Sequence, residues 1–109
     1  MTSLIEQESK MYRLYKIVYS DSFFEELDET IIYISDVLYD FKAAYRLINK
    51  VEKMINKLQL FPRLFQRFCD TDYRRIVIDN FIIIYIVDDL NRVVQIRHFY
   101  YTPRKSYNL

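Results

Sequence analysis

The sequence contains no glycine, only two prolines and a single cysteine in 109 residues. Without glycine there is no glycine-rich loop to cradle a phosphate, which excludes P-loop and dinucleotide-binding motifs. Backbone positions that need a positive φ must fall mainly to Asn and Asp, so Asp79-Asn80 and Asp88–Asn91 are the expected turns. Cys69 cannot form an internal disulfide and fits a reducing cytoplasm. Because no His/Asp pattern accompanies it, we do not expect it to be a nucleophile.

Long apolar runs are missing too. The longest, Phe81–Val87, has seven residues, whereas a membrane-spanning helix needs about 20. The first ten residues are polar and lack the apolar centre of a secretion signal. We therefore expect a soluble, cytoplasmic protein with one domain over residues 11–109. Residues 1–10 form an extension outside it, with Met11 as an alternative native start.

The net charge of +1 conceals a strong polarity along the chain. Residues 1–40 hold 9 acidic and 3 basic side chains, a balance of −6, and residues 41–109 hold 6 acidic and 13 basic ones, a balance of +7. Such an asymmetry indicates a localised basic surface, as nucleic-acid binders have. Two oppositely charged solvated faces are the alternative.

The first half of the chain predicts a strand followed by two helices. Arg13–Tyr19 alternates as a strand does, and Ser20 or Ser22 caps the helix after it. A second helix covers about Phe41–Leu60 and ends at Phe61-Pro62. The short connection between the helices predicts an antiparallel hairpin. The apolar positions of the first helix, spaced by three and four residues, are Phe24, Leu27, Ile31, Ile34 and Leu38.

The second half predicts three strands, at Tyr73–Ile78, Phe81–Val87 and Val93–Tyr101. A two-residue turn at Asp79-Asn80 sets the register of the first two strands, so that Ile78 faces Phe81 and Arg74 faces Tyr85. Both faces of the resulting sheet are apolar, yet the helices suffice to cover only one. We predict an α+β domain of order β-α-α-β-β-β, with a helical hairpin on one face of a mainly antiparallel four-stranded sheet. The uncovered face predicts a partner.

This pattern resembles the RelE/ParE superfamily of bacterial type II toxins over residues 11–107. The resemblance rests on the segments KIVYSDSFFEELDETIIYI, AAYRLINKVEKMINKLQLFP, YRRIVIDNFIIIYIVDD and RHFYYTPRKSY. It implies a toxin neutralised by a cognate antitoxin whose extended segment wraps it. RelE-type members cut mRNA in the ribosomal A site with no metal or other cofactor, whereas ParE-type members poison DNA gyrase and have no nuclease chemistry. An inactive homologue that only binds its antitoxin is a third hypothesis.

Strand parity supplies the candidate site. It places Arg75 on the open face, and if Val94, Ile96 and Tyr100 face the helices, then Arg97, Phe99 and Tyr101 join it, while His98 points toward the helices. Arginine suits a phosphate because its planar guanidinium can donate two parallel hydrogen bonds. The candidate catalytic residues are Arg75, Arg97, Tyr101 and Tyr107. The candidate nucleic-acid-binding residues are Arg67, Arg74, Arg104 and Lys105. The candidate antitoxin-binding residues are Val77, Ile82, Ile84 and Phe99.

Two positions depart from the RelE-type pattern. Such nucleases usually carry an arginine directly after the leading aromatic residue of the middle strand, and that position here is Ile82, which cannot bind a phosphate. The tail also has an inserted-looking Thr102-Pro103 before Arg104. Arginines and tyrosines on the open face still make mRNA cleavage the first hypothesis, with gyrase inhibition as the alternative.

Overall fold

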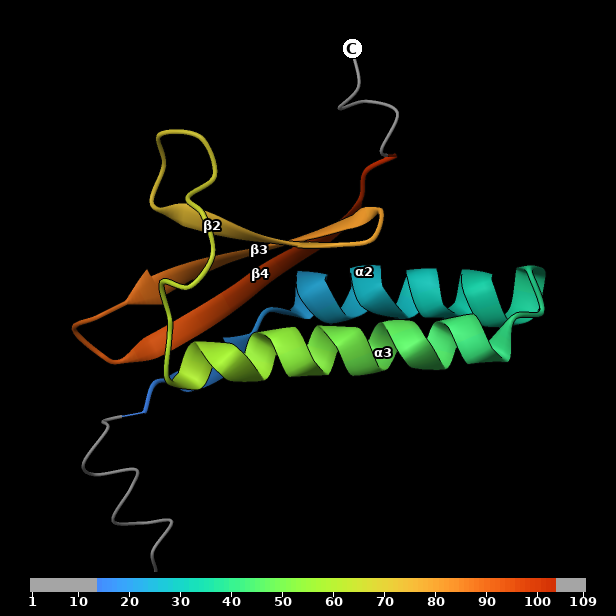
Figure 1. Ribbon diagram of the computed structural model, residues 1–109, viewed down its shortest axis with the longest axis horizontal. Coiled ribbons are helices and arrows are strands. Elements are labelled where there is room, and N and C mark those ends of the chain that lie inside the picture. Colours follow the sequence, from blue (N-terminus) through green and yellow to red (C-terminus); the bar gives the residue numbers. More distant parts are fainter. Residues whose placement is uncertain (1–13, 104–109) are drawn as a thin grey trace, which may run out of the picture.

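A computed structural model describes residues 14–103 (Figure 1). The predicted extension at residues 1–10 lies outside this range, as do three candidate site residues of the tail, Arg104, Lys105 and Tyr107. The elements in chain order are β1 (Lys16–Tyr19), α2 (Asp21–Ile32), α3 (Phe41–Asn56), β2 (Tyr73–Ile78), β3 (Phe81–Asp88) and β4 (Val93–Tyr101). A π-helical turn, Tyr33–Val37, extends α2, and a 3-10 turn, Lys57–Gln59, extends α3.

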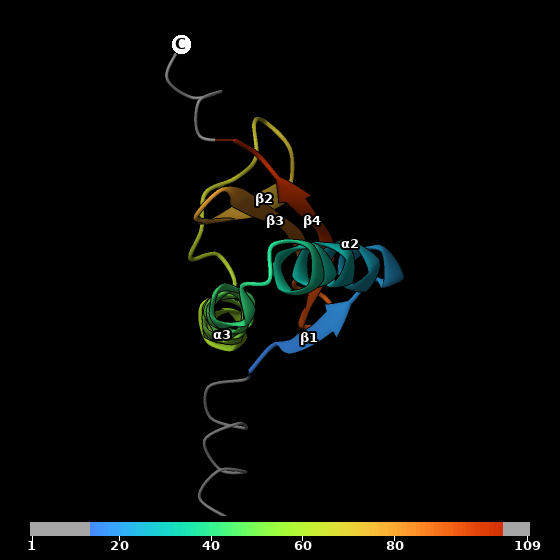
Figure 2. The ribbon, with the colours of Figure 1, turned by 90° about the vertical axis from the view of Figure 1, so that its right-hand side faces the viewer.

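The four strands form one sheet in the order β1-β4-β3-β2, in which β1 runs parallel to β4 and the other neighbours are antiparallel. Viewed along the helices, α2 and α3 lie side by side (Figure 2). The predicted α+β architecture is therefore confirmed. No helix in residues 14–103 is long and apolar enough to cross a membrane.

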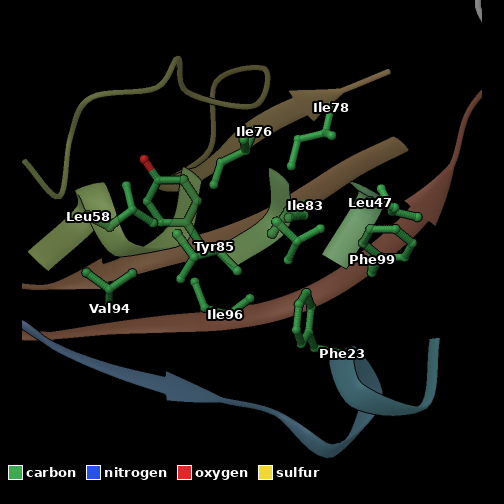
Figure 3. Close-up of a cluster of buried hydrophobic side chains, with 12 residues drawn as sticks. Phe23, Leu47, Leu58, Ile76, Ile78, Ile83, Tyr85, Val94, Ile96 and Phe99 are labelled. Atoms are coloured by element: carbon green, nitrogen blue, oxygen red, sulfur yellow. The ribbon is translucent and has the colours of Figure 1, made fainter. Parts of the chain in front are cut away.

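The core lies between the helical hairpin and one face of the sheet. Figure 3 shows its side chains converging from both layers, with the ring of Tyr85 among isoleucines. The Tyr85 hydroxyl donates a hydrogen bond to the Pro62 carbonyl oxygen at 3.0 Å, so this buried phenol keeps a polar partner. Burial raises the pKa of Tyr85 above its ordinary value.

The β2–β3 register is the one that the Asp79-Asn80 turn predicts. Ile78 pairs with Phe81 and Arg74 pairs with Tyr85, and Asp79 has a φ of 53°. The expectation that Asn and Asp take most positive-φ positions is wrong, since Tyr39, Cys69 and Arg92 also have a φ between 52° and 54°.

The predicted apolar face of the first helix is partly wrong. Phe23 is 1% exposed and lies in the core, whereas Phe24 is 48% exposed. Ser20 caps α2 by accepting a hydrogen bond from the Phe23 backbone N–H at 3.1 Å, and this start fixes the rotation of the helix about its axis. Leu38 is exposed because the α-helix ends at Ile32 and the π-helical turn changes the angular spacing of the residues after it.

Candidate functional site

The face of the sheet away from the core contains a groove of about 760 Å³. Strands β2, β3 and β4 supply its floor and walls, and the loop before β2 supplies one rim. Its lining residues are Phe68, Thr71, Tyr73, Arg75, Ile82, Ile84, Arg97, His98, Tyr100, Tyr101 and Thr102. We call it the open-face groove.

A β-bulge at Arg97 decides which β4 side chains enter this groove. Ile84 pairs with His98 but the next residue, Tyr85, pairs with Ile96, which leaves Arg97 without an opposite residue on β3. Ser20 stabilises the bulge, because its hydroxyl donates a hydrogen bond to the Arg97 carbonyl oxygen at 2.6 Å. The alternation of β4 therefore changes phase at Arg97.

The phase change corrects three sequence-based placements. Phe99, predicted on the open face as an antitoxin-binding residue, is 3% exposed in the core, where its ring stacks on Phe81 at 5.0 Å. Tyr100 and His98, both predicted to face the helices, line the open-face groove instead. Tyr101 lies at the end of β4, where it contacts Phe81 and lines both this groove and a second one beside α2.

His98 is held by a partner from α2. Its Nδ1 lies 3.0 Å from the Glu26 Oε1, and its ring stacks on Tyr100 with centroids 5.2 Å apart and planes 14° from parallel. Both partners are partly accessible: the His98 side chain is 40% exposed and that of Glu26 27%. This arrangement fixes the ring plane of an imidazole at the wall of the groove.

Two arginines reach the same groove. The Arg97 guanidinium donates a hydrogen bond to the Gln95 side-chain oxygen at 3.1 Å. The Arg75 guanidinium has no hydrogen-bond or ion-pair partner among residues 14–103, so it is available to an anionic ligand. The structure thus brings together Arg75, Arg97 and Tyr101, as the sequence predicted.

The predicted nucleic-acid-binding arginines lie elsewhere. Arg74 donates to the Phe65 carbonyl oxygen at 2.8 Å, and Arg67 donates to that of Thr71 at 3.1 Å. Both line a smaller groove of about 380 Å³ together with Arg63. Arg74 points to the opposite side of β2 from Arg75 because successive strand residues alternate. Neither Arg67 nor Arg74 lines the open-face groove.

The floor of the open-face groove is apolar and largely covered. Ile82 and Ile84 of β3 are 5% and 8% exposed, whereas Val77 of β2 is 52% exposed. The uncovered apolar face expected from the sequence is therefore narrower than predicted, since surrounding side chains already shield its two isoleucines. Of the four predicted antitoxin-binding residues, Val77 alone is exposed.

Glu26 and Tyr100 are the site residues that the sequence did not suggest. In the sequence Glu26 is one of several acids near the start of a helix, and no local pattern connects it to His98, 72 residues later. Within residues 14–103 no three His, Cys, Asp or Glu side chains are grouped to hold a metal ion.

Comparison with known proteins gives a consistent picture. One family model, described as ParE toxin of type II toxin-antitoxin system, parDE, matches residues 17–101. A search of the curated proteins finds no match.

Three solved structures share the fold. A chain of the chromosomal ParDE system from P. aeruginosa has a TM-score of 0.69 and 14% identity, with 83% of this chain and 98% of that chain covered. A chain of a RelBE toxin–antitoxin complex from Mycobacterium tuberculosis has a TM-score of 0.59 and 14% identity, with 81% of this chain and 98% of that chain covered. A chain of the intact E. coli RelBE complex has a TM-score of 0.58 and 14% identity, with 83% of this chain and 99% of that chain covered.

Proposed function

Since the chain belongs to the ParE toxin family of type II toxin–antitoxin systems, we propose that it arrests growth by binding and inhibiting DNA gyrase, as ParE-type toxins do, without cutting RNA. The observation that carries this proposal is the floor of the open-face groove. Ile82 occupies the position of the middle strand at which RelE-type nucleases usually carry an arginine, and its neighbour on the groove floor, Ile84, is apolar as well. Gyrase inhibition thereby replaces mRNA cleavage as the first hypothesis.

The open-face groove also supports a proposed docking site for the cognate antitoxin. Apolar Val77, which pairs with the groove residue Ile82 across β2 and β3, offers contact area beside the groove. The free guanidinium of Arg75 suits an acidic side chain of the partner. Groove recognition by an extended segment gains affinity from such apolar contacts and specificity from the charged ones.

A supercoiling assay tests the first proposal. Purified chain in excess over gyrase should inhibit supercoiling, and the cognate antitoxin should relieve the inhibition. Unimpaired gyrase at a large excess of the chain would exclude gyrase as its target.

A binding titration tests the docking site separately. Val77→Asp introduces a charge beside the groove, next to Ile82, and should raise the dissociation constant for the antitoxin by at least about tenfold. Val18→Asp is the matched control, because Val18 is likewise an exposed strand valine, on β1. Equal affinities for both variants would place the antitoxin elsewhere.

The His98–Glu26 pair favours one second candidate, metal-independent RNA cleavage. In that reaction the ribose 2′-hydroxyl attacks the adjacent phosphate, a base accepts its proton, and an acid protonates the leaving 5′-oxygen. An imidazole can exchange protons near neutral pH. Arg75 and Arg97 would stabilise the phosphorane charge, and Tyr100 could stack on a base.

Programmed ribosomes separate the two candidates. Gyrase inhibition predicts no new 5′ ends in the A-site codon, whereas the nuclease candidate predicts cuts that His98→Gln abolishes. If the wild-type chain cuts mRNA and leaves supercoiling normal, RNA cleavage becomes the first candidate and gyrase inhibition is excluded.

A further inference from the structure

The far end of the helical hairpin carries an exposed apolar surface, two of whose residues, Tyr33 and Leu38, line the groove beside α2 together with Tyr101. Helices α2 and α3 project past the end of the sheet (Figure 1). Between residues 32 and 45 the exposed fractions of seven large apolar residues lie between 54% and 79%. They are Ile32, Tyr33, Val37, Leu38, Tyr39, Phe41 and Tyr45, which we call the hairpin-tip patch. Apolar surfaces gathered in this way mark contacts with other macromolecules.

The turn that presents this patch is well ordered by hydrogen bonds. Asp40 caps α3 by accepting a hydrogen bond from the Ala43 backbone N–H at 3.0 Å. The Leu38 backbone N–H donates to the Tyr33 carbonyl oxygen at 3.1 Å, and Tyr39 adopts a φ of 52°. The tip is thus a defined shape, in which Tyr39 is the most exposed residue of the patch.

The charges along the hairpin are segregated by helix. Helix α2 carries no Lys or Arg, and α3 carries one acidic residue, Glu52. The exposed acids of α2 are Asp21, Glu25, Asp28 and Glu29. The exposed cations of α3 are Lys42, Arg46, Lys50 and Lys53. Lys50 pairs with Asp79 of the β2–β3 turn at 2.9 Å, and the other three supply the positive charge of this helix. The outer surface of the hairpin is therefore negative along one helix and positive along the other.

We propose that a second copy of this chain covers the hairpin-tip patch in a two-fold symmetric dimer. Two-fold axes that bring the two outer hairpin surfaces face to face can run along the helices or across them. An axis along the helices sets α2 against α3 of the second copy and brings both tips to the same end. An axis across them sets α2 against α2, where like charges repel. Only the axis along the helices brings opposite charges together and also brings the two apolar tips to the same end.

The surface is thus complementary to itself, which a two-fold interface requires. Glu29 on α2 precedes Tyr39 by ten residues and Arg46 on α3 follows it by seven. Each therefore lies within about three helical turns of the tip, and the proposed axis places Glu29 of one copy near Arg46 of the other. The proposed dimer does not require gyrase to be the target, because it uses the hairpin-tip patch and not the open-face groove.

Sedimentation velocity over a concentration series up to about 1 mM tests the dimer with the full chain. The wild type should shift from the mass of one chain to that of two. Phe41→Ser with Tyr45→Ser should raise the dissociation constant at least about tenfold. Leu90→Ser is the matched control, because Leu90 is 92% exposed in the β3–β4 turn and should change nothing. Circular dichroism verifies that each variant is folded.

Charge reversal tests the geometry of the dimer. Glu29→Lys should weaken it by placing like charges together, and adding Arg46→Glu to the same chain should restore it, since each copy then supplies both reversed partners. The proposal is overturned if the wild-type chain stays monomeric at every concentration. It is also overturned if the dissociation constant of the dimer does not change with these substitutions. Tip variants that lose growth arrest while the wild type stays monomeric would assign the tip to the cellular target instead.

Discussion

The Nδ1 of His98 lies 3.0 Å from the Oε1 of Glu26, although 72 residues separate them in the chain. The contact exists because α2 continues from β1, which pairs with the first half of β4 only. The Ser20 backbone N–H donates to the Ile96 carbonyl oxygen, and the helix that begins there runs on beside the second half of β4. Because α2 takes the place beside β4 that a longer β1 would occupy, the Glu26 side chain reaches the wall of the open-face groove.

Glu26→Gln keeps the shape of the side chain and removes its charge. Because inhibition of gyrase by binding needs no proton transfer, we expect inhibition of supercoiling to stay within about threefold of the wild type. If the chain cuts RNA instead, weakened general acid–base catalysis should lower the rate by about 100-fold or more. Glu25→Gln, an exposed neighbour, is the control for both assays, and a loss of supercoiling inhibition specific to Glu26→Gln would contradict the binding mechanism.

The β-bulge makes a prediction about stability at two consecutive residues. Phe99→Ala removes a buried ring that contacts Phe23 and Phe81, so the free energy of unfolding should fall by about 3–5 kcal/mol. Tyr100→Ala removes a half-exposed ring and should cost about 1 kcal/mol or less. Urea denaturation measures both, and the reverse order would mean that β4 alternates without the bulge.

Ser20 and Ser22 offer a matched pair for the helix cap. Ser20 accepts from the Phe23 N–H and donates to the Arg97 carbonyl oxygen, so Ser20→Ala should lower the free energy of unfolding by about 1–2 kcal/mol. Ser22 is exposed within the first turn, and Ser22→Ala should be close to neutral. Chemical denaturation of the two variants decides the point, and equal losses would remove the special role of Ser20.

Asp89 makes the stability of the fold depend on pH. Hydrogen bonds from Arg63 and from the Tyr15 hydroxyl lower the pKa of Asp89 from 3.8 to about 2. A carboxylate whose pKa is lower in the folded state stabilises the fold above its ordinary pKa, and this stabilisation is lost as the pH falls from about 4 to about 2.

Asp89→Asn should therefore lower the melting temperature at pH 7 slightly, because the pair is exposed. Between pH 4 and pH 2 the difference between the wild type and the variant should shrink. Asp28→Asn, an exposed carboxylate of α2, should leave the wild-type profile unchanged. A difference that persists at pH 2 would show that the Asp89 charge is not its source.

Local signals explain the parts of the fold that were predictable. The Asp79-Asn80 turn set the β2–β3 register because two strands joined by a two-residue turn have little freedom to slip. Strand boundaries at Tyr73–Ile78 and Val93–Tyr101 followed from apolar and β-branched runs and agree with the structure. These features depend on residues close together in the chain.

The candidate site was predicted less well because it depends on distant residues. Arg75 was placed correctly since it belongs to the turn-fixed hairpin. The error at Phe99 arose because no residue of β4 signals a bulge that a hydroxyl 77 residues earlier stabilises. Glu26 was not predicted as a site residue, because helical spacing cannot show which strand edge the helix covers.

By itself, then, the sequence determined the order of elements, the hairpin register and an α+β architecture, because turns, caps and apolar periodicity act over a few residues. The toxin family was indicated by the resemblance of its segments to that family. The tertiary structure decided which side of the sheet His98, Phe99 and Tyr100 face, and with them the lining of the open-face groove. The physical reason is the Ser20–Arg97 hydrogen bond. It joins the start of α2 to the middle of β4, and such a contact is set only when the whole sheet and helix pack together.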